Sequence, residues 1–371
     1  MTPLHEDWQI LTGLFPAGWR ELARTSSAVH RLRGFSGVEQ ILRTILLHVG
    51  CGWGLKETAV HARLGGIAKV SSVTLMNRLR DAELWLRRLC EQLFQENGVC
   101  LQPAVKGRPV RLVDATNVKE PGKTGSQWRV HYSLRLPSLD CDYFELTPVR
   151  GKNHGERLGR FHVQPGELIL ADAGYSHPPG IASIVAQRAD VCVRWNPTSM
   201  PLLSEDGTTV FPVMESLKGL RRAGQIAEWP VRLRCDMDSI AGRVCALRKS
   251  RTAIRKAQRK ITRKVQQKKI SSGRQARRFV CYVMVFTTLP REIADCETVL
   301  ECYRLRWQIE LAFKRLKSIM QFGHVPKQSD QSGRAWLYGK LFVALLAEKM
   351  ARVGSTISPW GYNLPRQSAR S

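Results

Sequence analysis

The sequence lacks the cysteine and histidine spacings that bind zinc or carry thiol chemistry. Its ten cysteines are dispersed without a C-x-x-C pair, and its nine histidines form no HExxH motif. Neither a zinc site nor a redox motif is therefore indicated. We expect the cysteines to be reduced, small apolar residues of a cytoplasmic protein.

Long apolar runs and the layout of a signal peptide are also missing. No uninterrupted apolar stretch approaches the roughly 18 residues that a membrane span requires. The N-terminal segment MTPLHEDWQILTG contains acidic residues, which a signal peptide avoids. We therefore expect no membrane partner.

Acidic residues are scarce beside basic ones. The chain has 31 Asp and Glu against 58 Lys and Arg, a net charge of +27, while its apolar content of 43% is ordinary for a globular protein. Such an excess indicates a polyanionic partner, and DNA or RNA in the cytoplasm is the simplest one. With 371 residues the chain is long enough for two or three domains.

Residues 1–100 have a helical pattern. Apolar residues recur at helical spacing over 38–49, a glycine-rich break follows, and further helices are expected at 55–64 and 73–94. Helix, turn and arginine-bearing helix are compatible with a DNA-binding helix-turn-helix, although an ordinary helical bundle has the same pattern. We predict an N-terminal helical, DNA-binding domain and assign no residues within it.

The pattern changes to strands near residue 108. Strands are expected at 108–118, 130–136 and 142–149, joined by turn-rich linkers that favour an antiparallel meander. Asp114 is expected at the end of the first strand. A fourth strand at 167–171 leads into Asp172, and a helix and a further strand follow.

This order predicts an α/β catalytic domain with a mixed sheet, formed by residues 101–196 and 279–330. The apolar run 279–287 returns to a strand pattern after the segment 197–278. Whether that strand joins the main sheet or closes the segment before it is open. Residues 331–371 are predicted as a C-terminal helix and a tail rich in Ser, Pro and Arg.

Residues 197–278 are predicted as a β-rich, basic insertion. Fifteen Lys or Arg and no acidic residue occur between Arg243 and Arg278, and an apolar helical stripe runs through this segment. A helix so rich in cations favours contact with DNA phosphates, although a flexible basic arm has the same composition. The candidate contacts are Arg255, Lys256, Arg259, Lys260, Arg263 and Lys264.

A helix is predicted from Tyr303 to Lys317. Its sequence, YRLRWQIELAFKRLK, contains no Gly or Pro and many good helix formers. One stripe of this helix carries Tyr303, Arg306, Glu310 and Lys317. A carboxylate there can bind a divalent metal while the cations hold phosphates, although a solvated helix with a Glu–Arg pair has the same stripe.

The spacing Tyr303-x2-Arg306-x3-Glu310-x6-Lys317 resembles the signature of the insertion sequence 4 family of bacterial transposases. The segments VDATN and ADAGY resemble the two aspartate motifs of that family, and the order of the motifs also matches. The resemblance covers roughly residues 109–320 well. It implies a ribonuclease-H-like catalytic domain in which Asp114, Asp172 and Glu310 bind a pair of Mg²⁺ or Mn²⁺ ions.

The resemblance also implies a reaction and its partners. A dimer would bind double-stranded DNA at the terminal inverted repeats, cut it, commonly through hairpin ends, and join it to target DNA. Tyr303, Arg306 and Lys317 would hold phosphates near the cleaved bond. Tyr175 would stack or hydrogen-bond close by, with a core tyrosine as the alternative. The expected location is the bacterial cytoplasm, in association with the nucleoid.

Three tryptophans have positions of interest. Trp195 and Trp229 are the nearest equivalents of the aromatic residue that stacks on a flipped base in hairpin-forming relatives, and core burial is the better interpretation for each. Trp307 is expected to pack under the catalytic site.

Two other classes of function stay open. A metal-dependent nuclease of the same fold would cut DNA without strand transfer. A non-catalytic DNA-binding protein would bind with the same salt dependence and cut nothing.

Overall fold

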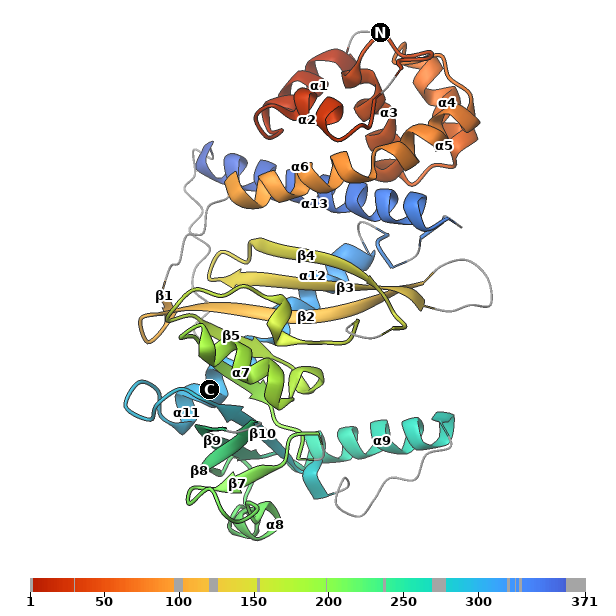
Figure 1. The fold of residues 1–371 in the computed structure, drawn as a ribbon. Coiled ribbons are helices and arrows are strands. Elements are labelled where there is room, and N and C mark those ends of the chain that lie inside the picture. The colour runs from red at the N-terminus through yellow and green to blue at the C-terminus, as the bar shows by residue number, and fades with distance from the viewer. Residues whose placement is uncertain are drawn as a thin grey trace. The chain divides into compact units, whose positions relative to one another are not determined.

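The computed structural model describes residues 3–29, 31–96, 103–119, 126–151, 154–197, 199–235, 238–268, 278–318, 321–323, 325–326 and 329–357. The chain forms two compact units (Figure 1). Unit 1 consists of Met1–Val99, Asn117–Arg129 and Phe313–Ser371. Unit 2 consists of Cys100–Thr116 and Val130–Ala312.

Unit 1 is mainly helical. Its helices are α1 (Pro3–Gly13), α2 (Trp19–Thr25), α3 (Val38–Cys51), α4 (Leu55–Leu64), α5 (Ser72–Asp81), α6 (Glu83–Glu96) and α13 (Asp330–Ile357). The long helix α13 packs against α6, α3 and α5. Gly339 permits a close approach to α3, because a Cβ at this position would lie 3.1 Å from Val49.

The single helix predicted over 73–94 is wrong. The chain turns at Ala82, between α5 and α6, and each helix buries its own apolar face. Leu75 and Leu79 are buried before the turn, and Trp85 and Leu86 are buried after it. Ala82 is a good helix former, so local propensity gives no sign of this break.

Unit 2 is built on a mixed sheet of ten strands. The strands are β1 (Pro103–Val105), β2 (Arg108–Lys119), β3 (Ser126–Leu136), β4 (Cys141–Pro148), β5 (Leu168–Ala171), β6 (Asp190–Arg194), β7 (Leu202–Ser204), β8 (Ile226–Cys235), β9 (Asp238–Arg248) and β10 (Tyr282–Thr287). Their order is β4-β3-β2-β5-β6-β10-β9-β8-β7, with β1 also paired to β2. The predicted α/β class with a mixed sheet is confirmed. The last residues of β2, from Asn117, and the first residues of β3, up to Arg129, belong to unit 1.

The pairing of strands changes from parallel to antiparallel at β10. Strands β2, β5 and β6 are parallel, whereas β10 is antiparallel to both β6 and β9. The predicted strand at 279–287 therefore joins the main sheet, and β7 to β9 continue that sheet beyond it. The limits of the predicted domains remain predictions.

Helices cover both faces of the sheet. Helix α7 (Pro178–Ala186) packs through Ile181 and Ile184 on a core that includes Val113 and Ala171. Helix α11 (Cys296–Arg304) contacts β6, β8, β9 and β10. Side chains alternate along a strand, so Asp114 and Asp172, which follow Val113 and Ala171, point to the face of the sheet opposite α7.

The remaining elements are short helices and two longer ones. They are η1 (Leu158–Arg160), η2 (Ala173–Tyr175), α8 (Val213–Ser216), η3 (Leu217–Gly219), α9 (Arg251–Lys268) and α12 (Trp307–Ser318). No helix among the described residues is both long and apolar enough to span a bilayer. Past Ile357, the predicted C-terminal tail lies outside the described residues.

Candidate active site

Asp114 and Asp172 come from neighbouring parallel strands. The β2–β5 register ends with Leu112 opposite Leu170, so two residues further along Asp114 and Asp172 are side by side. Asp172 directly follows β5, as predicted. The prediction that Asp114 ends its strand is wrong, because β2 also pairs with β3 and continues to Lys119.

Backbone amides hold both carboxylates. Asp114 Oδ1 accepts a hydrogen bond of 2.7 Å from the amide of Ala115, and Asp172 Oδ1 accepts one of 2.7 Å from Gly174. Burial and the charge of Asp172 raise the pKa of Asp114 to about 7, against the opposing effects of the Ala115 amide and a nearby arginine. Two crowded, partly buried carboxylates therefore share this end of β5.

The predicted helix over Tyr303–Lys317 is wrong, since the segment is broken into α11 and α12. Leu305 and Arg306 form the turn, and the amides of Leu305, Arg306, Gln308 and Ile309 each bond to the carbonyl three residues back. This tighter pattern replaces the α-helical one and changes the chain direction.

Arg306 lies between Glu310 and Asp114. Its Nη2 is 2.5 Å from Glu310 Oε1, and its Nη1 is 4.0 Å from Asp114 Oδ2. Its guanidinium carbon is 5.7 Å from the centroid of the Tyr303 ring, which is itself buried. Burial raises the pKa of Tyr303 to about 12, so its hydroxyl stays protonated. The structure thus brings Tyr303, Arg306 and Glu310 to the side of the paired aspartates.

The triad is not in direct ligand contact. The Glu310 side chain is 58% exposed and faces the guanidinium of Arg306 rather than the aspartates. Lys317 is exposed on α12, about two turns beyond Glu310, in the part of the helix that belongs to unit 1.

Tyr175 is fully buried, which agrees with the core alternative. Its hydroxyl has no hydrogen-bond partner among the described residues. Burial raises the pKa of Tyr175 well above its usual value, and the charges of Asp114, Glu156 and Asp172 add to this shift. The phenol therefore lies beside a group of carboxylates.

The tryptophans divide between core and surface. Trp195 is buried and donates from Nε1 to the carbonyl of Met200 at 2.8 Å, while Trp229 is partly buried against the same core. The core interpretation is confirmed for Trp195. Trp307 is 51% exposed, so the prediction that it packs under the site is wrong.

Sequence reasoning missed Glu156. This residue precedes η1 in the segment between β4 and β5, and its charge adds to the raised pKa of Asp114 after burial and Asp172. A Cβ on Gly174 would lie 1.7 Å from Glu156 Oε2 and 3.0 Å from Asp172 Oδ1, so both carboxylates flank one point. The sequence NHGERLGR shows neither strand nor helix periodicity, so nothing in it singles out Glu156. Only the closeness of Glu156 to the aspartates in the structure reveals this residue.

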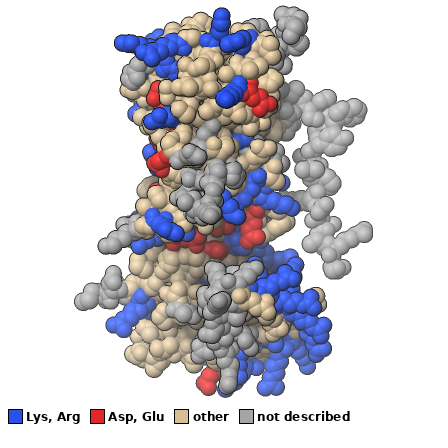
Figure 2. Space-filling model, turned by 90° about the vertical axis from the view of Figure 1, so that its right-hand side faces the viewer, with Lys and Arg blue, Asp and Glu red and all other residues tan. Residues whose placement is uncertain are grey.

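Helix α9 carries the predicted basic surface. Arg255, Lys256, Arg259, Lys260 and Arg263 are exposed, and the backbone of Lys264 lies in the same helix. The apolar residues Ile254, Ala257 and Ile261 are half-buried. On the face drawn in Figure 2, Lys and Arg gather in the part of unit 2 that contains α9. Contact with DNA is untested and remains a prediction.

Another group of potential metal ligands occurs in unit 2. One ligand atom each from Glu228, Cys245 and Cys296 lies within 4.8 Å of the others, a juxtaposition that the sequence spacing does not show. Glu228 is already paired with Arg243 at 2.5 Å and Arg291 at 2.9 Å. The two guanidiniums repel any cation that would bind to Glu228. The pair Asp114 and Asp172 is therefore the better candidate metal site.

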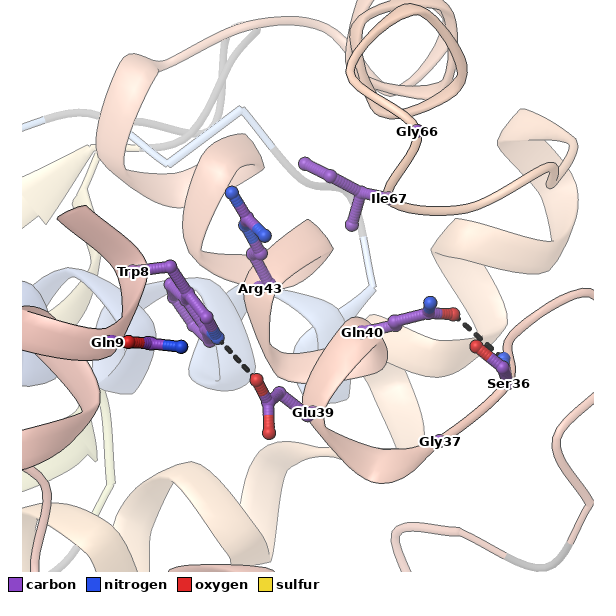
Figure 3. Close-up of a pocket in the computed structure, with 9 residues that line it drawn as sticks. All are labelled: Trp8, Gln9, Ser36, Gly37, Glu39, Gln40, Arg43, Gly66 and Ile67. Carbon is purple, nitrogen blue, oxygen red and sulfur yellow. Dashed lines mark hydrogen bonds between the residues drawn. The ribbon is translucent and has the colours of Figure 1, made fainter. Parts of the chain in front are cut away.

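The described residues of unit 1 include a polar hollow and a cationic one. One, of about 310 Å³, is lined by Trp8, Gln9, Ser36, Gly37, Glu39, Gln40, Arg43, Gly66 and Ile67 (Figure 3). Within it Trp8 Nε1 donates to Glu39 at 2.7 Å, and the Ser36 amide donates to Gln40 Oε1 at 2.7 Å. The other, of about 410 Å³, is lined by Arg31, Arg33, Thr74, Asn77, Arg78, Arg80 and Asp81 and is strongly cationic.

A mixed sheet with two crowded aspartates at one strand end, flanked by an arginine and a glutamate, is typical of enzymes of phosphodiester chemistry. The family model described as Transposase DDE domain matches residues 155–346. The chain belongs to this family and is a DNA transposase, an enzyme that cleaves DNA and transfers its strands. The family implies dependence on a divalent metal, and the oxygen donors of Asp114 and Asp172 fit such an ion.

The relatives are products of insertion sequences. The chain is 30% identical over 370 residues to InsL of IS186A from Escherichia coli (strain K12), which is named as a transposase, and the match covers 96% of each protein. It is 29% identical over 371 residues to the transposase of IS421 from Escherichia coli, again with 96% of each covered. The transposase of IS231F from Bacillus thuringiensis subsp. israelensis is 23% identical, with 89% of this chain and 76% of the relative covered.

A solved structure also resembles the chain in outline. It is the piggyBac transposase synaptic complex with hairpin DNA, which matches with a TM-score of 0.40 and 9% identity over 95% of this chain and 83% of that one. A likeness of this size carries no argument about the site.

Proposed function

We propose that this transposase excises and inserts its element by cut-and-paste, on a ribonuclease-H-like sheet, with Asp114, Asp172 and Glu310 as the catalytic carboxylates. The observation that carries the proposal is the crowding of Asp114 against Asp172 at the end of β5. Buried like charges are costly unless a cation is bound between them. Their donor set consists of oxygens alone, which suits Mg²⁺ or Mn²⁺ rather than zinc.

Asp114 and Asp172 would hold two such ions, with Glu310 as the third ligand residue. When bound, a pair of ions activates the attacking oxygen and neutralises the leaving oxygen of the phosphodiester. Glu310 is now paired with Arg306, whose guanidinium also binds phosphate well. A DNA phosphate that binds the guanidinium of Arg306 would therefore break its ion pair with Glu310, and the Glu310 carboxylate could then turn toward the aspartates.

The remaining predicted contacts have supporting roles in this proposal. Tyr303 and Lys317 would bind phosphates around the cleaved bond, and Tyr175 would support the aspartates from the core side. The exposed cations of α9 would bind the DNA backbone, with an affinity that falls steeply as salt rises.

In unit 1, α5 would be the helix that reads DNA sequence. A Ser71 cap begins this helix, which exposes Met76, Asn77 and Arg80 beside the cationic hollow described above. Asn and Arg are the side chains that best read adenine and guanine in the major groove, and the arginines of the hollow would bind the adjoining phosphate.

The complex on DNA would be a homodimer with two terminal inverted repeats, in the bacterial cytoplasm and associated with the nucleoid. The second strand would be cut through a hairpin at each excised end. A denaturing gel distinguishes these routes, because a hairpin end runs at twice the length of an open single strand. Light scattering of the DNA complex gives the number of subunits.

The test uses a duplex with the inverted repeat that flanks the gene, and a target plasmid. Glu310→Gln should keep its affinity for the duplex and lose Mg²⁺-dependent cleavage, at least about a thousandfold, because it lacks a charged ligand. Glu301→Gln, an exposed change on α11, is the matched control and should cut normally. Undiminished cleavage by Glu310→Gln would remove that residue from the mechanism.

The same assay separates the other two classes. Cleavage by the wild type without joining to the plasmid would identify a nuclease. Binding without any Mg²⁺-dependent nicking would identify a non-catalytic DNA-binding protein.

A further inference from the structure

We propose that Glu156 is an additional metal-binding carboxylate, which together with Asp114 and Asp172 binds a divalent cation before DNA arrives. This inference rests on the proposed function of the aspartate pair. It adds a residue that the three-carboxylate assignment leaves out. The three side chains belong to unit 2, so no closure of one unit on the other is needed to bring them together.

The position of Glu156 is set by its contact with Gly174. Its Oε2 occupies the space in which any side chain at position 174 would begin, since a Cβ there would lie 1.7 Å away. Gly174 is also the residue whose amide donates to Asp172 Oδ1 at 2.7 Å. Gly174 thus orients Asp172 through its amide. Because glycine has no side chain, it also leaves space for the carboxylate of Glu156.

The backbone of Glu156 is fixed on both sides. The Glu156 carbonyl lies 2.6 Å from His177 Nε2, which donates to it, and the Gly155 carbonyl accepts a hydrogen bond of 3.3 Å from Arg160 Nε. Arg160 is in turn bonded to both carboxylate oxygens of Glu145 on β4, at 3.0 and 2.9 Å. These contacts hold Glu156 in place, as a ligand residue requires.

Tyr175 supplies the second observation. Its side chain is 0% exposed, and its hydroxyl finds no hydrogen-bond partner among the described residues, although it lies within the electrostatic reach of all three carboxylates. A buried hydroxyl without an acceptor is costly. In this proposal a bound cation would draw the carboxylates together, so that one of their outer oxygens accepts a hydrogen bond from Tyr175.

Glu156 and Glu310 would act at different stages. Glu310 is exposed and held by Arg306, so it can join the cation only after Arg306 is released. Glu156 Oε2 already lies beside Asp172 in the DNA-free structure, and its charge already acts on Asp114. Affinity for the cation in the absence of DNA should therefore depend on Glu156, while cleavage should depend on both glutamates.

Calorimetric titration of the DNA-free, full-length protein with Mn²⁺ tests this division. Glu156→Gln should weaken Mn²⁺ binding by roughly 10–100-fold, and Glu310→Gln should change it by less than about twofold. Glu215→Gln, which removes an exposed carboxylate on α8, is the control and should bind like the wild type. Thermal unfolding of each variant confirms that it is folded.

Gly174→Ala provides an independent variant. Its methyl group would displace the Glu156 carboxylate without removing any charge, so it should weaken Mn²⁺ binding as Glu156→Gln does. Wild-type affinity in Glu156→Gln, or no saturable Mn²⁺ binding by the wild type, would overturn the inference. Mn²⁺ binding that depends on Glu156 in a protein that never cuts the inverted repeat would instead overturn the proposed function alone.

Discussion

Two groups of acidic side chains lie in unit 2, and they are neutralised to very different degrees. In the first, the buried Glu167 and the partly buried Asp142 lie beside two guanidiniums, with Asp142 Oδ2 at 2.9 Å from Arg111 Nη2 and 2.6 Å from Arg135 Nε. Arg135 also bonds Glu167, whose side chain is 0% exposed. Charges balance there, two against two.

The second group has an excess of negative charge. Asp114, Asp172 and Glu156 gather at the end of β5, and the guanidinium of Arg306 approaches Asp114 only to 4.0 Å while it is bonded to Glu310. In the proposed mechanism, this difference in neutralisation separates structural acids from functional ones. A balanced network holds strands together, whereas crowded carboxylates that oppose folding are retained where a cation has to bind.

Asp172→Asn should give the largest effect and show the second group to be functional. Loss of this carboxylate should reduce Mg²⁺-dependent cleavage at least about a thousandfold, or roughly 4 kcal/mol in the activation free energy. Stability should be unchanged or higher, because repulsion with Asp114 is removed. A gel assay and urea unfolding measure the two quantities. A marked loss of stability with cleavage intact would place Asp172 with the structural group.

Glu167→Gln should give the opposite result in the first group. The change leaves the guanidinium of Arg135 buried with one charged partner fewer, which should lower the free energy of unfolding by about 3 kcal/mol. Cleavage per folded molecule should stay near the wild-type value. Urea unfolding with active-site titration measures both, and an unchanged unfolding midpoint would contradict the balanced-network interpretation.

Asp114 should make stability fall as pH rises. Its pKa is about 7 in the folded protein, whereas an unfolded Asp has a pKa near 4. Between these values the folded protein binds more protons, so the free energy of unfolding should decline from about pH 4 to pH 7, by about 3 kcal/mol. Unfolding in EDTA at several pH values measures this decline. Asp114→Asn should flatten it, and equal slopes in both proteins would contradict the assigned pKa.

The sequence predicted the elements better than their junctions. Short apolar runs that end in a polar residue identify β5 and β6 correctly, because a buried strand is recognisable from its own composition. The turns at Ala82 and at Leu305–Arg306 were not predictable, since every residue there is a good helix former. Packing decides both turns, and local propensity does not register it.

The candidate site shows the same limit. Strand-end positions and the resemblance to family motifs indicated Asp114, Asp172 and Arg306, and the structure places the three close together. The pair between Glu310 and Arg306 was one of the two alternatives that the sequence left open, and the sequence could not choose between them, because an i,i+4 pair and a ligand position look alike in sequence. Glu156 was missed for a further reason, since it lies in an irregular segment and only the missing side chain of Gly174 admits it.

Glu310→Gln should have the smallest effect on stability and completes the comparison with Glu167→Gln. The chemical change is the same, but the Glu310 side chain is 58% exposed and that of Glu167 is 0% exposed. Solvent screens the exposed pair with Arg306, so the free energy of unfolding should fall by less than about 1 kcal/mol. Urea unfolding of the two variants side by side measures the difference. If Glu310→Gln were as destabilising as Glu167→Gln, its pair with Arg306 would be part of the architecture, and the release of Glu310 by a DNA phosphate would be too costly to belong to the reaction.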